Sequence, residues 1–140
     1  MKFDLRIKKL RHNAQMPTYG SEWAAGADMD AAVDEAVTIE PNETKFIPTG
    51  LAFEIPEGYA GFIYARSGLA CKKGLAPANK VGVVDADYRG EIMVALHNHS
   101  DIPQTISNGE RIAQLVVQPY VNVEFEEVDT LNSTDRGSGG

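Results

Sequence analysis

Cysteine, long apolar runs and positive charge are all scarce in this sequence. The single cysteine, Cys71, allows no disulfide within the chain, which suits a reducing compartment such as the cytoplasm. No run of apolar residues approaches the roughly 18 that a membrane-spanning helix requires. Residues 1–12 are charged throughout and lack an apolar block, so we expect no secretory signal peptide.

Basic residues are outnumbered, with 13 Lys and Arg against 20 Asp and Glu and a net charge of −7. A chain of this charge lacks the global positive field of a protein that binds duplex DNA. An anionic ligand therefore needs a local site built from a few arginines and backbone N–H groups. In other respects the 140 residues, 43% hydrophobic and 24% charged, are typical of one globular domain.

Apolar and polar residues alternate with a period of two along several segments, as in strands with one buried face. The clearest segments span residues 3–7, 51–55, 92–96 and 121–125. Turn-forming sequences rich in Gly, Pro and Asn separate such segments. Many short strands at regular spacing indicate an all-β protein, built as an antiparallel sandwich or barrel.

One short helix is expected over residues 68–73, with Ser67 as its N-terminal cap and Gly74 at its end. The Ala-rich stretch 24–36 could form a second helix, but Gly26 and three aspartates favour strand and loop there.

The end of the sequence differs from the rest, because residues 129–140 are polar, rich in Gly and contain one large apolar residue, Leu131. We therefore predict a β domain over 1–128 and a flexible C-terminal arm over 129–140. Such an arm is either a frayed terminus or a mobile segment that closes over a ligand.

The segment 64–69, Tyr-Ala-Arg-Ser-Gly-Leu, joins an expected strand to the expected helix. Unpaired N–H groups at such a junction bind anions, and Arg66 adds a permanently charged donor. Together they fit a phosphate chain. A serine cap beside a surface arginine explains the same pattern and, for the segment alone, is the commoner case.

The segment 82–90, Gly-Val-Val-Asp-Ala-Asp-Tyr-Arg-Gly, places Asp85 at the end of an apolar strand. A carboxylate held there could act as a general base on a water molecule, and Tyr88 could pack flat against a sugar. An ordinary β-turn, in which aspartates bond the nearby backbone, is the alternative.

Other single residues carry weaker signals. Gln114 lies within an apolar strand, so its amide must either brace a loop or face a polar site. Asp28 follows a tight Gly turn. His97 and His99 share one face of a strand, but no third metal ligand has suitable spacing. Cys71 precedes two lysines, and we expect a packed thiol there.

Taken in order, the segments resemble the five motifs of the trimeric deoxyuridine triphosphate nucleotidohydrolases (dUTPases). The matching segments are AGADMDAA (25–32), ARSGLACKKG (65–74), GVVDADYRGEI (82–92), NGERIAQLVV (108–117) and STDRGSGG (133–140). The resemblance covers the whole chain, and its third motif is the most specific. It implies a distorted jelly-roll-like β-barrel and a homotrimer whose sites draw motifs from neighbouring subunits.

The resemblance also implies an activity, the hydrolysis of dUTP to dUMP and pyrophosphate with Mg²⁺. Water would attack the α-phosphorus, and the reaction would lower dUTP and supply dUMP for thymidylate synthesis. Because Mg²⁺ keeps several waters and binds substrate phosphates, no cage of protein ligands is required. An acidic chain without a ligand cluster can therefore still be a metal-dependent enzyme.

Residue roles follow from matching positions in the motifs. Asp85 would orient or activate the attacking water, and Gln114 would contact the phosphates and that water. Tyr88 would lie under deoxyribose, Arg136 would clamp the terminal phosphate, and Asp28 would lie near the metal ion through water. The other contacts implied are phosphate binding by Arg66, Ser67 and Gly68, and uracil recognition by Asn79, Val83, Val84 and Met93.

Two alternatives stay open beside the dUTPase interpretation. A dCTP deaminase has a similar fold, but deamination requires an additional Glu in the pyrimidine pocket, and no convincing candidate is placed for it. A catalytically silent nucleotide-binding module is the other alternative, and the intact Asp85 argues against it. The fifth motif of the family usually continues to an aromatic residue that stacks on uracil, whereas this sequence stops at Gly140.

Overall fold

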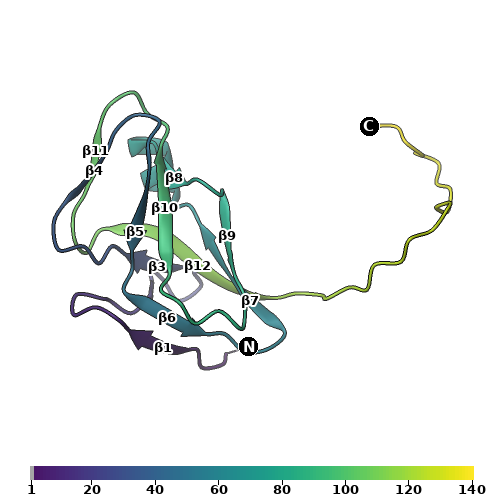
Figure 1. The fold of residues 1–140 in the computed structure, drawn as a ribbon, viewed down its shortest axis with the longest axis horizontal. Coiled ribbons are helices and arrows are strands. Elements are labelled where there is room, and N and C mark those ends of the chain that lie inside the picture. Colours follow the sequence, from purple (N-terminus) through teal and green to yellow (C-terminus); the bar gives the residue numbers. More distant parts are fainter. Residues whose placement is uncertain (1) are drawn as a thin grey trace.

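In residues 2–140, which this computed structural model describes, the fold consists of short strands and one helical turn (Figure 1). The first strands are β1 (Arg6–Lys9), β2 (Thr18–Tyr19), β3 (Ala27–Asp30), β4 (Val37–Ile39), β5 (Thr44–Pro48), β6 (Leu51–Glu54) and β7 (Tyr59–Tyr64). The helix η1 (Leu69–Lys73) precedes β8 (Leu75–Pro77), β9 (Val81–Val84), β10 (Met93–Asn98), β11 (Gln104–Ile106) and β12 (Arg111–Pro119). The all-β prediction is confirmed.

The strands pair in antiparallel fashion and form sheets of different sizes. The largest sheet has five strands in the order β2-β3-β12-β7-β9, and a three-stranded sheet has the order β5-β10-β8. Two smaller sheets pair β1 with β6 and β11 with β4. Because β3 and β12 are distant in sequence, the largest sheet brings both halves of the chain together. Closure into a barrel and assembly as a homotrimer stay predictions.

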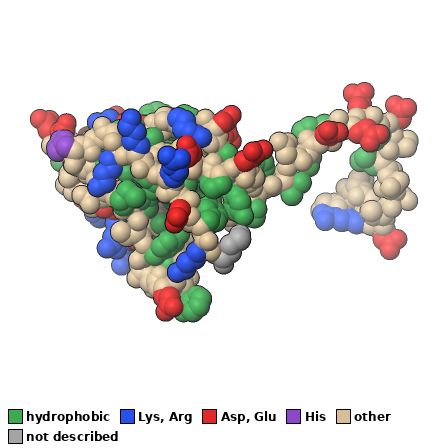
Figure 2. Space-filling model, turned by 90° about the horizontal axis from the view of Figure 1, so that it is seen from below, with side chains coloured by type: hydrophobic (Ala, Val, Ile, Leu, Met, Phe, Trp, Pro, Cys, Tyr) green, Lys and Arg blue, Asp and Glu red, His purple; other side chains and the backbone are tan. Residues whose placement is uncertain are grey.

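The chain leaves the largest sheet after β12, and residues 120–140, the C-terminal segment, extend away from the body (Figures 1 and 2). All of these residues are exposed, and none of them lies in a strand. The prediction of a strand over 121–125 is therefore wrong, since its alternating side chains find no partner strand. Phe125, for example, is 95% exposed.

The helical turn departs from the expected one at its start. Gly68 occupies the N-terminal cap position of η1, and no side chain caps it. The prediction that Ser67 caps the helix is wrong, because Ser67 already lies in the helical turn rather than before it. Gly74 ends the helix as predicted, with a φ of 69° and its N–H donating to the Leu69 carbonyl oxygen. The stretch 24–36 forms β3 and loops, as predicted.

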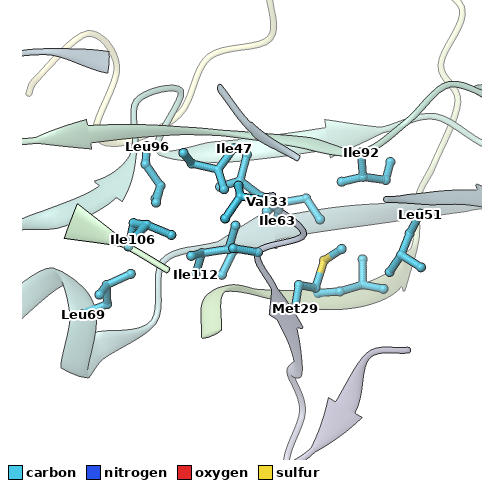
Figure 3. Close-up of a cluster of buried hydrophobic side chains, with 14 of the residues drawn as sticks. Met29, Val33, Ile47, Leu51, Ile63, Leu69, Ile92, Leu96, Ile106 and Ile112 are labelled. Carbon is cyan, nitrogen blue, oxygen red and sulfur yellow. The ribbon is translucent and has the colours of Figure 1, made fainter. Parts of the chain in front are cut away.

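Aliphatic side chains from different sheets form the core (Figure 3). Ile47 of β5, Leu96 of β10 and Ile112 of β12 are fully shielded from solvent. Along β10, buried Val94 and Leu96 alternate with more exposed residues, beginning with Met93. Burial of one face of β10 in this core leaves the other face free to line a cavity.

Candidate active site

Four polar side chains form what we call the polar cluster: Asp28, Arg66, Arg111 and Gln114. The register of the largest sheet places Asp28 of β3 opposite Gln114 of β12, which in turn lies opposite Tyr64 of β7. Arg66 Nε donates a hydrogen bond to Asp28 Oδ1 over 2.8 Å, and Arg111 Nη1 lies 3.7 Å from Asp28 Oδ2. The Asp28 side chain is only 13% exposed, so the two guanidinium groups compensate its charge.

Gln114 holds the loop between β7 and η1. Its Nε2 donates to the Ala65 carbonyl oxygen over 2.8 Å, directly before Arg66. Gly26 lies so close that a Cβ there would overlap the Gln114 amide, so this packing requires glycine. Of the two roles left open by the sequence, bracing a loop is the one observed.

Ser67 and Gly68 follow Arg66 directly, and both are exposed. A Cβ added to Gly68 would meet open space, so a ligand could approach the backbone closely there. The Ala70 N–H donates to the Arg66 carbonyl oxygen over 2.9 Å, which ties Arg66 to the helical turn. The second motif thus presents an arginine, a hydroxyl and accessible backbone together, a combination suited to a phosphate chain.

Asp30 is a second carboxylate on the same face of β3 as Asp28. Burial raises the pKa of the Asp30 carboxyl, and Arg111, which lies opposite in the register, partly offsets the rise. The charge of this region is thus shared between two acids and two arginines.

A cavity of about 380 Å³, within the usual range for small-molecule sites, lies beside β9 and β10. Six of the predicted site residues line the cavity: Asn79, Val83, Val84, Asp85, Tyr88 and Met93. Val83 and Met93 expose apolar side chains in it, 58% and 39% exposed, while Asp85 and Asn79 add polar groups. Such a mixture suits a nucleoside, whose base is flat and whose edges carry donors and acceptors.

The turn after β9 is held by its own backbone and side chains. The Tyr88 N–H donates to the Asp85 carbonyl oxygen over 3.1 Å, and Arg89 Nη1 donates to the Ala86 carbonyl oxygen over 2.6 Å. The Tyr88 hydroxyl donates to the Glu91 carbonyl oxygen over 3.1 Å. These contacts fix the backbone of the turn while the Asp85 side chain stays exposed.

Phe46 and Arg111 are among the residues of these sites that the sequence did not single out. Phe46 lines the cavity with a side chain that is 68% exposed, opposite Ala95 of β10. Its strand, β5, is short and flanked by turns, so no alternation pattern identified it. Arg111 joins the polar cluster, and its place on the same apolar strand as Gln114 was the available signal.

The predicted site residues thus fall into separate groups within one chain. The six cavity residues form one group, and Asp28, Arg66 and Gln114 form another that contributes nothing to the lining of the cavity. Arg136 lies in the C-terminal segment, where its Nε donates to the Gly139 carbonyl oxygen over 2.6 Å. Within one chain, one part of the predicted site therefore lies at the cavity and another part lies at the polar cluster.

The histidines and the cysteine are separate from both groups. His97 Nδ1 lies 2.9 Å from Thr44 Oγ1, and His99 Nε2 lies 3.1 Å from the Ala70 carbonyl oxygen. Cys71 is exposed, so the prediction of a packed thiol is wrong: η1 directs its thiol outward. Within residues 2–140, no three His, Cys, Asp or Glu side chains are grouped to hold a metal ion. The helical turn of this range is also far too short to cross a membrane.

A cavity suited to a nucleoside and a polar cluster suited to phosphates, both on an all-β chain, define the class of a nucleotide-binding β protein. The dUTPase family model matches residues 12–140. A deoxyuridine 5′-triphosphate nucleotidohydrolase of Paraburkholderia phytofirmans is 43% identical over 100% of this chain and 95% of its own. One from Desulfitobacterium hafniense is 50% identical over 90% of this chain and 84% of its own.

Solved structures give the same result. The dUTPase of Staphylococcus bacteriophage 80alpha with dUPNHPP has a TM-score of 0.89 and 32% identity over 99% of this chain and 96% of its own. A mutant of that phage dUTPase also has a TM-score of 0.89, and the match covers 100% of this chain and 98% of its own. The chain belongs to the dUTPase family, and the prediction of a dUTP diphosphatase is confirmed.

Proposed function

We propose that this chain hydrolyses dUTP to dUMP and pyrophosphate by water attack on the α-phosphorus, with Asp85 as the general base. The observation that carries the proposal is the cavity, which groups Asp85 with Asn79, Val83, Tyr88 and Met93. An exposed carboxylate at the edge of a cavity that fits a nucleoside can accept a proton from a water next to the α-phosphate. The relatives named above as deoxyuridine 5′-triphosphate nucleotidohydrolases support the choice of substrate.

The base and the sugar occupy the cavity in this proposal. Asn79, Val83 and Val84 recognise uracil largely through the backbone of their hairpin, and Met93 packs beside them. Tyr88 lies under deoxyribose and leaves no partner for a 2′-hydroxyl. The solved complex of a similar phage dUTPase with dUPNHPP supports nucleotide binding by this fold.

The phosphates are bound by the second, fourth and fifth motifs. Arg66, Ser67 and Gly68 supply a guanidinium, a hydroxyl and accessible backbone, and Gln114 adds an amide close to them. Arg136 clamps the terminal phosphate when the arm, residues 129–140, closes over the ligand. Preorganised donors of this kind stabilise the charge that develops during phosphoryl transfer.

Mg²⁺ fits this site as an ion held mainly by the substrate. Both oxygens of Asp28 already face arginines, and no three-ligand group occurs in residues 2–140, so the described residues of one chain offer the ion no direct cage. Asp28 can still contact a hydrated ion through water, since each carboxylate oxygen has a second acceptor site. When bound, Mg²⁺ would neutralise charge on the phosphates.

The assembly proposed is a homotrimer of β-barrel domains with shared sites. The separation of the cavity, the polar cluster and Arg136 within one chain supports this assembly, because neighbouring copies can complete one another's sites. The exposed alternation of Val121, Val123 and Phe125 supports it too, since a second copy can cover that face. The single cysteine suits a cytoplasmic enzyme that lowers dUTP and supplies dUMP.

One assay separates the proposal from its alternatives. The purified protein with Mg²⁺ should release pyrophosphate from dUTP and no ammonia from dCTP. Ammonia from dCTP would favour a deaminase, and tight binding of dUTP without either product would favour a silent binding module.

A further inference from the structure

A partly exposed ion pair lies next to the turn that carries Asp85 and Tyr88. Arg11 Nε donates to Glu91 Oε2 over 2.7 Å, and Arg11 Nη2 donates to Glu91 Oε1 over 3.0 Å. The Gly50 N–H also donates to Glu91 Oε2 over 2.9 Å. The two-pronged arginine contact restricts the carboxylate in both position and orientation.

The carboxylate of this pair is more shielded from solvent than that of another ion pair of the chain. The Glu91 and Arg11 side chains are 19% and 41% exposed, whereas Glu54 and Arg6, paired over 3.0 Å between β6 and β1, are 45% and 81% exposed. The hydrogen bond from Arg11 holds the pKa of Glu91 below its ordinary value, and the hydrogen bond from Gly50 acts in the same direction. Glu91 is therefore ionised whenever the site is active near neutral pH.

The segment that carries Arg11 is itself fixed against the turn at Gly50. The Leu10 N–H donates to the Gly50 carbonyl oxygen over 2.7 Å. Gly50 has a φ of 70°, and a Cβ there would lie 2.7 Å from the Ala14 Cβ and 3.1 Å from the Arg11 Cβ. Glycine is thus required for the approach of the two segments, which places the guanidinium at a defined point.

Glu91 is linked to the candidate catalytic turn on its other side. Its carbonyl oxygen accepts the Tyr88 hydroxyl over 3.1 Å, and Glu91 lines the cavity together with Asp85 and Tyr88. The next residue, Ile92, exchanges backbone hydrogen bonds with Leu51 and Thr49. One end of the turn is therefore anchored to the body through residues 91 and 92.

We propose that Arg11 is a positioning residue for hydrolysis, which it assists by clamping the Glu91 carboxylate against the turn at Gly50. The inference rests on the function proposed above, in which this cavity holds dUTP beside Asp85 and Tyr88. Clamping has two effects: it fixes the end of the turn, and it keeps a negative charge of the cavity wall neutralised and away from a polyanionic substrate. Arg11 lies outside the five motifs that identified the family.

The test compares two arginines that each pair with a glutamate, Arg11→Gln and the matched control Arg6→Gln. Arg11→Gln should lower kcat/KM for dUTP by about 10- to 100-fold, as expected for a misplaced catalytic group, while Arg6→Gln stays near wild type. Binding of a non-hydrolysable dUTP analogue should weaken in the same variant. Arg11→Lys keeps the charge but loses the two-pronged contact, so its kcat/KM for dUTP should lie between those of wild type and Arg11→Gln.

A double variant separates charge from geometry. Adding Glu91→Gln to Arg11→Gln removes the unpaired carboxylate, so KM should recover towards wild type while kcat stays low. Melting temperatures of every variant establish that the compared proteins are folded, and Arg11→Lys carries the test if Arg11→Gln does not fold.

Different results would overturn the role of Arg11 and the proposed function. Kinetic constants for Arg11→Gln within about twofold of Arg6→Gln would overturn the role of Arg11. No recovery of KM in the double variant would overturn the electrostatic part of that role. Failure of the wild type and of Arg6→Gln to hydrolyse dUTP would instead overturn the proposed function.

Discussion

The polar cluster and the cavity hold two halves of the candidate site in opposite ways. In the polar cluster the side chains bond one another: Arg66 and Arg111 face Asp28, and Gln114 braces the loop before Arg66. In the cavity the Tyr88 and Arg89 side chains and the backbone hold the turn, whereas the Asp85 side chain itself is exposed. Substitutions in the polar cluster should therefore affect both stability and activity, and substitution of Asp85 should affect activity alone.

Asp85→Asn should produce the largest effect on activity and none on stability. The amide keeps the shape but accepts no proton, so kcat should fall by about 10²- to 10⁴-fold. Asp87→Asn, in the same exposed turn, is the matched control and should be nearly as active as wild type. A folded Asp85→Asn protein with normal kcat would remove Asp85 from the catalytic role.

Arg66→Ala should affect both properties, because it leaves the Asp28 carboxylate without its closest donor. We expect the free energy of unfolding to fall by about 1–3 kcal/mol, and kcat/KM to fall by roughly 100-fold through loss of a phosphate donor. Denaturant melts and steady-state kinetics measure the two effects. A loss of activity without a change in the free energy of unfolding would contradict the claim that the side-chain contacts of the polar cluster stabilise the fold.

Tyr88 should discriminate against ribonucleotides. A 2′-hydroxyl buried against the ring without a partner costs about 1–3 kcal/mol, so kcat/KM for UTP should be roughly 10- to 100-fold below that for dUTP. Tyr88→Ala should narrow this ratio, whereas Tyr88→Phe keeps the ring and should preserve it. Equal cleavage of UTP and dUTP by the wild type would contradict the role of the ring.

Removal of residues 133–140 extends the comparison to a third region, which contacts neither group. Stability should change by less than about 0.5 kcal/mol, because these residues are exposed and bury no apolar surface. We expect kcat/KM to fall about tenfold, and Arg136→Gln alone to give most of that loss. Equal kcat/KM for residues 1–132 and 1–140 would mean that Arg136 takes no part in the site.

The smallest effect expected is on the pH dependence of stability. The pKa of Glu91 is lowered in the folded chain from its ordinary value of 4.5. Its ion pair with Arg11 therefore stabilises the fold at pH values above 4.5. This contribution, below about 1 kcal/mol because the Arg11 side chain is 41% exposed and solvent screens the pair, should be lost as the pH falls below 4.5 towards the lowered pKa. Glu91→Gln should flatten the acid limb of the stability profile, and an unchanged limb would contradict the coupling.

The sequence predicted the parts of the molecule that depend on local residues. The third motif identified four residues that line one cavity, Val83, Val84, Asp85 and Tyr88, and Gly74 predicted the end of the helix. The alternation over 121–125 failed, because alternation indicates a face suited to burial and carries no information on the strand that covers it. Phe46 was missed for a related reason: it reaches the cavity through pairing of β5 with β10, far along the chain.

The polar cluster depends in the same way on distant pairing. Asp28 and Gln114 lie opposite each other only because β3 pairs with β12. Their motifs were found separately in the sequence, while the ion pair of Asp28 with Arg66 and the contact with Arg111 follow from the register of the sheet. Local patterns thus identify candidate residues, and long-range strand pairing decides which of them meet.

The central claim is that the cavity of one chain and the polar cluster of another form a single site, and a mixing experiment tests it most directly. Asp85→Asn chains and Arg66→Ala chains are each nearly inactive, and they are denatured together in equal amounts and refolded. Random assembly of trimers should restore about a quarter of wild-type activity, because that share of sites combines two intact halves. Activity no higher than the sum of the two variants alone would contradict shared sites.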